Sequence, residues 1–112
     1  MKLVITIISA DKLEIMKTIA DKFGGSGMTM TSVMGCGTQK GKKTDFKGVV
    51  TEINLLPKVK VEMYVKDEVV DELLNAIQRE ISTGNIGDGK VCVINIDDLM
   101  RIRTGERGEK AL

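Results

Sequence analysis

Residues 58–65 alternate strictly between polar and apolar side chains, and this pattern constrains the fold more than any other feature of the sequence. The apolar positions are Val59, Val61, Met63 and Val65, and the polar positions between them are Lys58, Lys60, Glu62 and Tyr64. Successive side chains of a strand point to opposite faces, so the segment predicts a β-strand with one buried face and one open face. Pro57 suits the first residue of this strand, because it has no N–H to donate to a neighbour.

Three further strands and two helices are predicted from the rest of the chain. Residues 2–9 and 90–96 are apolar runs rich in β-branched side chains, which predicts strands buried on both faces. In residues 28–35, Met and Thr alternate and are followed by Ser, Val and Met, with a period near two that predicts another strand. Apolar side chains at helical spacing indicate one helix through Leu13, Met16, Ile19, Ala20 and Phe23 and a second through Val70, Leu73, Leu74, Ile77 and Ile81.

The predicted helices also have start signals. Asp11 and Glu14 resemble a capping box at the first helix, and Asp67 can cap the second. The resulting order, β-α-β-β-α-β, predicts a ferredoxin-like α+β fold, with a four-stranded antiparallel sheet and two helices on one face. The 112 residues fit a single domain, 1–112, with a flexible, lysine-rich loop at about 37–55 and a loose polar tail at about 105–112.

Composition excludes several classes of function. A net charge of +1, with three aromatic residues, argues against a nucleic-acid-binding protein. The chain has no His, which excludes His-based triads and most zinc chemistry. Cys36 and Cys92 match no metal or redox spacing. Because the sequence contains neither a signal peptide nor an apolar run long enough for membrane insertion, we expect a cytoplasmic protein.

A glycine-rich segment at residues 84–90 is the best candidate for ligand binding. It has three Gly in six positions and ends in Lys90. Glycine allows consecutive N–H groups to point into one concavity, which attracts phosphate oxygens, and the Lys adds a positive charge. From local sequence alone, a plain turn between helix and strand is an equal alternative. A Walker A motif is excluded, because Val91 replaces the magnesium-binding hydroxyl and the loop precedes a strand.

Arg101 and Arg103 are the second candidate. In an extended segment, side chains two residues apart emerge on one face, where two guanidinium groups could bind a polyphosphate. Taken alone, a solvated pair of charges explains these two residues better.

At this point the chain resembles the PII signal-transduction proteins of nitrogen regulation over essentially its full length. The motifs that carry the resemblance are Thr29 in GMTMT, G-x-G-x-QKG at 35–41, LPKVK-x-E at 56–62, TG-x-IGDGK at 83–90 and RIRTGE at 101–106. The resemblance implies a homotrimer with ATP or ADP bound in clefts between subunits. It assigns nucleotide binding to Ile7, Thr29, Gly37, Thr38, Gln39, Glu62, Tyr64, Gly87, Asp88, Gly89, Lys90, Arg101 and Arg103.

The resemblance further implies a second ligand, a metal ion and a regulated partner. Gln39, Lys40 and Lys58 would contact 2-oxoglutarate, and Gln39 would help ATP phosphates to hold Mg²⁺. The long loop would dock on an ammonium channel, a nitrogen-metabolism enzyme or another transporter. The docking residues would be Lys42, Lys43, Phe46 and Lys47. The resemblance implies a regulator and not an enzyme. The other hypothesis is a small enzyme on the same scaffold, which would need a catalytic pair, and Asp88 with Lys90 is the only local candidate.

Four positions depart from the family pattern. Ser9 replaces a basic residue and Thr38 replaces an Arg that most relatives carry. Thr51 stands where relatives carry the uridylylated Tyr, and Val49 where some carry a phosphorylated Ser. We therefore expect no modification at these two positions. The departures at Ser9, Thr38 and in the loop favour an alternative, a PII-like nucleotide-binding regulator that is unrelated to nitrogen and does not sense 2-oxoglutarate.

Overall fold

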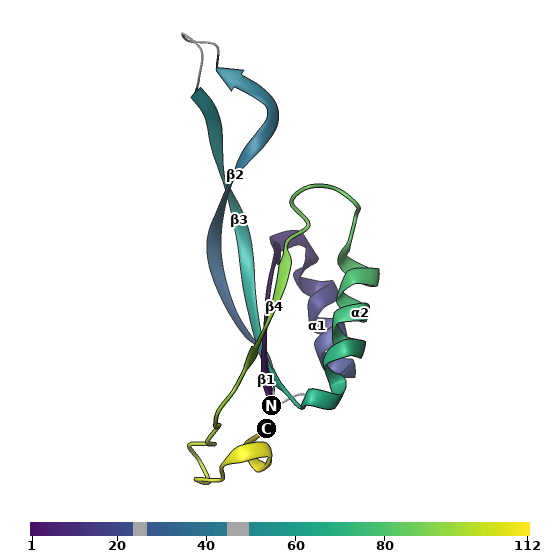
Figure 1. Cartoon of the computed structure of the whole chain (residues 1–112), viewed down its shortest axis with the longest axis vertical. Helices are drawn as coiled ribbons and strands as arrows, with labels where there is room; N and C mark the ends of the chain where they lie inside the picture. The colour runs from purple at the N-terminus through teal and green to yellow at the C-terminus, as the bar shows by residue number, and fades with distance from the viewer. Residues whose placement is uncertain (24–26, 45–49) are drawn as a thin grey trace.

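The structure is a computed structural model that describes residues 1–23, 27–44 and 50–112, with the backbone alone described at 37–44 and 50–54. Its strands are β1 (Lys2–Ser9), β2 (Thr29–Thr44), β3 (Val50–Val65) and β4 (Lys90–Asn95), and its helices are α1 (Leu13–Lys22) and α2 (Val70–Ile81). The strands form one antiparallel sheet in the order β2-β3-β1-β4, and both helices cover the same face (Figure 1). The predicted ferredoxin-like fold is therefore confirmed.

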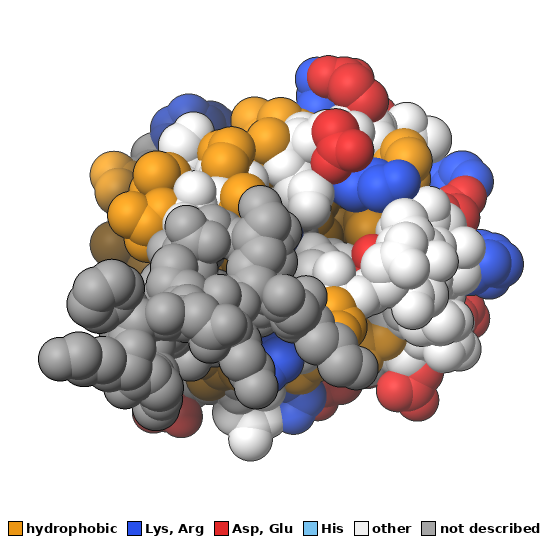
Figure 2. Space-filling view, turned by 90° about the horizontal axis from the view of Figure 1, so that it is seen from above, with side chains coloured by type: hydrophobic (Ala, Val, Ile, Leu, Met, Phe, Trp, Pro, Cys, Tyr) orange, Lys and Arg blue, Asp and Glu red, His pale blue; other side chains and the backbone are white. Residues whose placement is uncertain are grey.

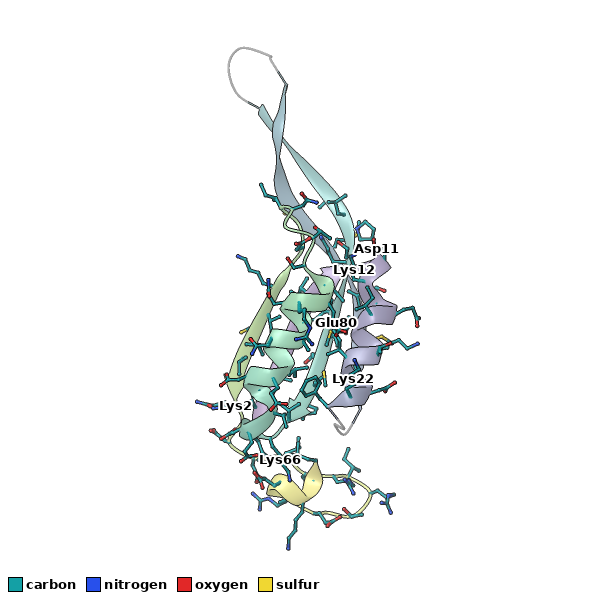
Figure 3. All side chains as sticks on the ribbon, turned by 90° about the vertical axis from the view of Figure 1, so that its right-hand side faces the viewer. Lys2, Asp11, Lys12, Lys22, Lys66 and Glu80 are labelled. Carbon is teal, nitrogen blue, oxygen red and sulfur yellow. The ribbon has the colours of Figure 1, made fainter. Side chains whose placement is uncertain are left out.

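The core lies between this sheet and the two helices. Val4 and Ile8 of β1 and the alternating apolar residues of β3 pack against the apolar stripes of α1 and α2. Thr6 is the one polar residue among the described residues that is buried there. At the helix surface, Lys22 of α1 lies beside Glu80 of α2, with 3.9 Å between Nζ and Oε1 (Figure 3).

The prediction that β1 and β4 are buried on both faces is wrong for the single chain. β1 is buried only on its helix side, and Ile7 on the opposite side is 39 % exposed. β4 is an edge strand, and all of its side chains except that of Val91 are exposed. We call the sheet surface away from the helices the open face. On this face the β1 side chains Leu3, Ile5 and Ile7 are apolar, and no described element packs over them.

The connection between β2 and β3 is a long hairpin whose strands extend beyond the predicted boundaries. β2 continues to Thr44 and β3 begins at Val50, with an irregularity in the pairing between Thr38 and Lys43. This hairpin projects from the sheet (Figure 1), and it raises the radius of gyration to 17.4 Å. A compact domain of this length would have about 13 Å. Pro57 lies inside β3, where its missing N–H is tolerated because β1 ends opposite Lys58 and leaves that edge free.

The predicted capping contacts are absent from both helix starts. Each helix begins with a 3₁₀ turn, Ala10–Lys12 or Asp67–Val69, and neither turn nor helix has a side-chain cap hydrogen bond. The extra turn moves Asp67 away from the cap position. Its carboxylate instead pairs with the N-terminal ammonium of Met1 at 2.8 Å, and the hydrogen bond from that ammonium holds the pKa of Asp67 below its usual value.

Residues 105–112, for which the sequence suggests a loose tail, make defined contacts. The Gly108 N–H donates to the Leu99 carbonyl at 2.9 Å, and a short 3₁₀ turn, Gly108–Ala111, buries Ala111. Within the three described stretches of chain, no helix is long and apolar enough to cross a membrane.

Candidate functional site

Residues 82–90, which we call the glycine loop, connect α2 to β4 along a tightly constrained path. Gly84, Gly87 and Gly89 have φ values of +80°, +103° and +108°, in the region that only glycine adopts readily. A Cβ on Gly89 would stand 1.9 Å from the carbonyl oxygen of Ile7, so the loop packs directly against the end of β1. The backbone path of the loop therefore requires glycine at these positions.

The Asp88 carboxylate holds the glycine loop together. It accepts hydrogen bonds from the N–H groups of Thr83 and Gly84, at 2.7 and 3.0 Å, and from the hydroxyl of Thr83. The Thr83 hydroxyl, followed by its N–H, is the main reason that the pKa of Asp88 lies below its usual value. Asp88 thus organises the loop through its side chain, so only its main-chain atoms are free to face a ligand.

Three lysines gather on the open face beside the glycine loop. We call Lys58, Lys60 and Lys90 the lysine corner. Lys60 and Lys90 flank Ile7 on the two neighbouring strands, and Lys58 is opposite Ser9. Neither Lys60 nor Lys90 pairs with a carboxylate in the described part of the chain. The corner therefore presents positive charge next to glycine-loop amides, which suits an anion.

Lys60 and Ser9 are not among the predicted site residues. The alternation in β3 does contain a signal for Lys60, because it puts Lys60 on the same face as Lys58 and Glu62. Ser9 stands out in the sequence only as a departure from the family pattern. Local periodicity does not indicate that it lies opposite Lys58, since the two are 49 residues apart and meet only through sheet register.

Three more of the residues that the resemblance assigns to nucleotide binding lie farther along the open face. Glu62 is in register with Thr29 of β2 and with Ile5 of β1, and Tyr64 lies one step beyond, opposite Leu3. These side chains share the face of the lysine corner. The structure thus brings Thr29, Glu62 and Tyr64 onto one surface with Ile7.

The two arginines lie at the other end of the molecule. Ile96 follows β4 and bonds to Met1, whereas Lys90 at the start of β4 is beside the glycine loop (Figure 1). The length of β4 alone separates these ends by about 17 Å. Arg101 and Arg103 are therefore not part of the same surface as the glycine loop of their own chain.

The segment that carries these arginines is a turn, and not the extended segment in which both side chains would emerge on one face. The N–H groups of Thr104 and Gly105 both donate to the Arg101 carbonyl. Arg101 also donates from Nη2 to the Leu112 main-chain oxygen at 2.7 Å and lies 3.7 Å from a carboxylate oxygen of Glu106. These contacts fix Arg101 and leave Arg103 exposed at the tip.

The remaining predictions fall on the long hairpin. The backbone is described at Gly37, Thr38, Gln39, Lys40, Lys42 and Lys43, but their side chains are not, and Phe46 and Lys47 lie outside the described residues. The described residues contain no group of three or more side chains suited to hold a metal ion. Seen from the hairpin end, the described surface carries interspersed acidic, basic and apolar side chains (Figure 2).

Comparison with known sequences identifies close relatives over the whole chain. Residues 1–106 match the family model for nitrogen regulatory protein P-II. The chain is 44 % identical over 112 residues to nitrogen regulatory protein P-II 2 of Methanothermobacter thermautotrophicus, covering all of this chain and 97 % of that protein. It is 41 % identical to nitrogen regulatory protein GlnK of Escherichia coli K12, with both chains fully covered.

Comparison with solved structures also finds proteins named GlnK. B. subtilis GlnK superposes with a TM-score of 0.82 at 34 % identity, covering 99 % of this chain and 97 % of that one. The complex of B. subtilis GlnK with ATP also gives 0.82, at 33 % identity, covering 99 % and 94 % of the two chains. With its fold, its glycine loop and its full-length relatives in agreement, the chain belongs to the P-II family of nitrogen regulatory proteins.

Proposed function

We propose that this P-II family regulator binds ATP and ADP competitively in clefts between the subunits of a homotrimer. The observation that carries the proposal is the glycine loop, which packs on Ile7 and adjoins three lysines on one face. Main-chain N–H groups and ammonium groups so arranged suit a polyphosphate. The similarity to a GlnK structure that contains ATP supports the same ligand.

The distribution of the site residues supports a shared cleft. The glycine loop and the arginines of one chain lie at opposite ends of the sheet, so a nucleotide on one chain's glycine loop needs the arginines of a neighbour. The open face is also suited to burial, since Ile7, Tyr64 and Ile94 are each 37–43 % exposed on it. A trimer that covers this face would complete three sites at once.

A second ligand, 2-oxoglutarate, is proposed to bind at Lys58 with Gln39 and Lys40 of the hairpin. The Lys58 ammonium is positioned at the junction of hairpin and glycine loop, where a keto-acid would lie beside the phosphates. Mg²⁺ would reduce the repulsion between the two anions. Since the described residues offer no cluster of metal ligands, most of its ligands would come from the nucleotide, the keto-acid and Gln39.

The long hairpin is proposed to carry the signal to a partner protein in the cytoplasm. Ligand-dependent shifts among hairpin conformations would control docking on a transporter or an enzyme of nitrogen metabolism. Charge reversal at Lys42 and Lys43 should weaken docking on an acidic partner surface, and unchanged binding would exclude docking through these two residues.

Isothermal titration with ATP and ADP tests the nucleotide proposal. We expect saturable binding of both nucleotides and mutual competition, with binding lost or strongly weakened in Lys90→Met. The matched control is Lys66→Met, because Lys66 is an exposed lysine outside the site. No binding of ATP up to about millimolar concentration, a free energy of about −4 kcal/mol, would contradict the proposal.

Ser9 favours a second candidate, a regulator that binds nucleotide without sensing 2-oxoglutarate. The hydroxyl of Ser9 adds no charge to the lysine corner, so a dianionic keto-acid meets fewer cations there. The discriminating measurement is the ATP affinity with and without saturating 2-oxoglutarate and Mg²⁺. An unchanged ATP affinity supports the second candidate, and a tighter one supports the first.

A further inference from the structure

The ammonium group of Lys58 joins three parts of the structure that are distant in sequence. Its Nζ donates to the hydroxyl oxygen of Ser9 at 3.2 Å and to the carbonyl oxygen of Gly87 at 2.8 Å. Ser9 is the last residue of β1 and lies directly opposite Lys58 in the sheet. One cation therefore connects the end of β1, the base of the hairpin in β3 and the glycine loop.

The path of the Lys58 side chain depends on a glycine in β2. A Cβ on Gly35 would stand 2.9 Å from Cγ of Lys58 and 3.5 Å from its Cε. The absence of a side chain at Gly35 therefore leaves room for the aliphatic part of Lys58 to pass toward the glycine loop. The contact between Lys58 and Gly87 therefore depends on Gly35 of β2 as well as on Lys58 of β3.

Both oxygen atoms that accept from Lys58 are uncharged. None of the ion pairs among the described residues includes Lys58. An ammonium group has three donors, so one N–H and the full positive charge remain after Ser9 and Gly87 are satisfied. The cation is held in place by neutral groups and is still able to attract an anion.

We propose that Ser9 is a positioning residue, whose hydroxyl holds the Lys58 ammonium against the Gly87 carbonyl and so couples the glycine loop to the hairpin base. The Gly87 carbonyl and the Asp88 N–H belong to one planar peptide unit, so a fixed carbonyl also fixes the direction of that N–H. Gly87, with φ at +103°, has no Cβ to oppose rotation of this peptide. An anion at Lys58 and a phosphate at the glycine loop therefore act on the same element.

A double-mutant cycle on the intact protein tests this role. The variants are Ser9→Ala, Lys58→Met and their combination, with Ser9→Thr as the conservative variant that keeps the hydroxyl. The matched control is Ser32→Ala, an exposed serine of β2 outside the site. The readouts are the amide NMR signals of Gly87, Asp88 and Gly89 without ligand, and the ATP dissociation constant by calorimetry.

We expect Ser9→Ala and Lys58→Met to shift the three amide signals, and Ser9→Thr and Ser32→Ala to leave them in place. Loss of one hydrogen bond to a half-exposed ammonium should weaken ATP binding by about three- to fivefold in Ser9→Ala. In the Lys58→Met background, Ser9→Ala should have no further effect, since it acts through that ammonium. A purely structural role of Ser9 would not depend on Lys58 in this way.

Two results would overturn the inference. One is that Ser9→Ala leaves both the amide signals and the ATP affinity unchanged, and the other is that its effect persists without Lys58. The ligand part of the inference rests on the proposed nucleotide site, and the two can fail separately. If the wild-type protein does not bind ATP, the proposed function fails, whereas the amide signals still test the Ser9–Lys58–Gly87 contact.

Discussion

At the residue scale, Gly89 is the position where the local path leaves the least freedom. Its φ of +108° strains any other residue, and a Cβ there would also collide with the Ile7 carbonyl oxygen. Gly84 has a similar φ of +80°, but a Cβ added there would meet no atom within 4 Å. A substitution at Gly84 would therefore measure the cost of backbone strain alone, and one at Gly89 the cost of strain and steric clash together.

Gly89→Ala is expected to lower the free energy of unfolding by about 3 kcal/mol or more, since strain and backbone displacement add. Gly84→Ala, the matched control, should cost about 1 kcal/mol from the left-handed conformation alone. Urea denaturation at one fixed protein concentration measures both values. Equal losses would show that the contact between Gly89 and Ile7 is not a constraint.

Asp88 makes the glycine loop sensitive to acid. Its pKa lies below the ordinary 3.8, chiefly because the hydroxyl and N–H of Thr83 donate to the carboxylate. A group whose pKa is lower in the folded state contributes stability above its unfolded pKa, and that contribution is lost as the pH falls through the folded pKa. The loop should therefore keep its structure at neutral pH and loosen below about pH 3.8.

The expected measurement is a pH series of the amide signals of Thr83 and Gly84. In the wild-type protein both signals should move only as the pH falls through the lowered pKa of Asp88, below 3.8, because protonation weakens the hydrogen bonds to its carboxylate. In Asp88→Asn both should already be displaced at neutral pH, with the acid transition gone. A transition that survives in Asp88→Asn would have to come from another carboxylate.

At the element scale, the turn that carries Arg101 and Arg103 is fastened at its base. Arg107 donates from Nε to Oδ2 of Asp98 at 2.7 Å, and its Nη2 also contacts that oxygen. The hydrogen bond from Arg107 is the largest reason that the pKa of Asp98 is below its usual value. The backbone of Arg107 also forms an isolated β-bridge with Met100, so the turn is carried by a short, closed loop.

Arg107→Met should loosen this loop and weaken ATP binding by about threefold, because the arginines are then held less well for a neighbouring site. Calorimetric titration of ATP measures the change. Lys110→Met, an exposed lysine of the same segment, is the control and should bind ATP as the wild type does. Equal affinities in Arg107→Met and the control would show that the Asp98–Arg107 pair is not needed to present the arginines.

The elements themselves are well predicted, because their signal is local periodicity. The buried stripes of both helices and the alternating core residues of β3 agree with the predicted positions. The helix starts are predicted less well, since the sequence shows a possible cap but not the 3₁₀ turn that displaces it. The turn at Arg101 is also missed, because two arginines at i and i+2 look the same in a strand and in a turn.

At the scale of the whole molecule, the open face is the feature that one chain leaves unfinished. The sequence predicts β1 and β4 as buried on both faces, and the single chain buries β1 on one face only and leaves β4 exposed. Apolar side chains on a sheet surface of this kind favour association. If other subunits cover the open face, β1 and β4 become buried on both faces, as the sequence predicts.

Ile5→Lys should therefore dissociate the proposed trimer, because it inserts a charge at the centre of the open face. Ile5 is paired with Glu62 and Cys92 on either side, so its substitution disturbs the middle of the sheet surface. Light scattering should give three times the 12.2 kDa chain mass for the wild type and one times that mass for the variant. Thr18→Lys on the exposed side of α1 is the control.

A trimer that persists in Ile5→Lys would show that subunits do not meet through the open face. A monomeric wild-type protein would contradict the trimer itself, and with it the shared cleft. In that case the arginines could not contribute to the site, and nucleotide binding would depend on the glycine loop and the lysine corner alone.

The sequence by itself determined the order of the elements, the core-facing sides of α1, α2 and β3, and the glycine loop with Lys90. Each of these depends on residues close together in the chain, so periodicity and glycine spacing are enough. Only the tertiary structure decided that Ser9 and Gly87 meet at Lys58. It also decided that Arg101 lies at the end of the sheet away from the glycine loop. The physical reason is strand register, which joins residues distant in sequence through main-chain pairing that side-chain patterns do not encode.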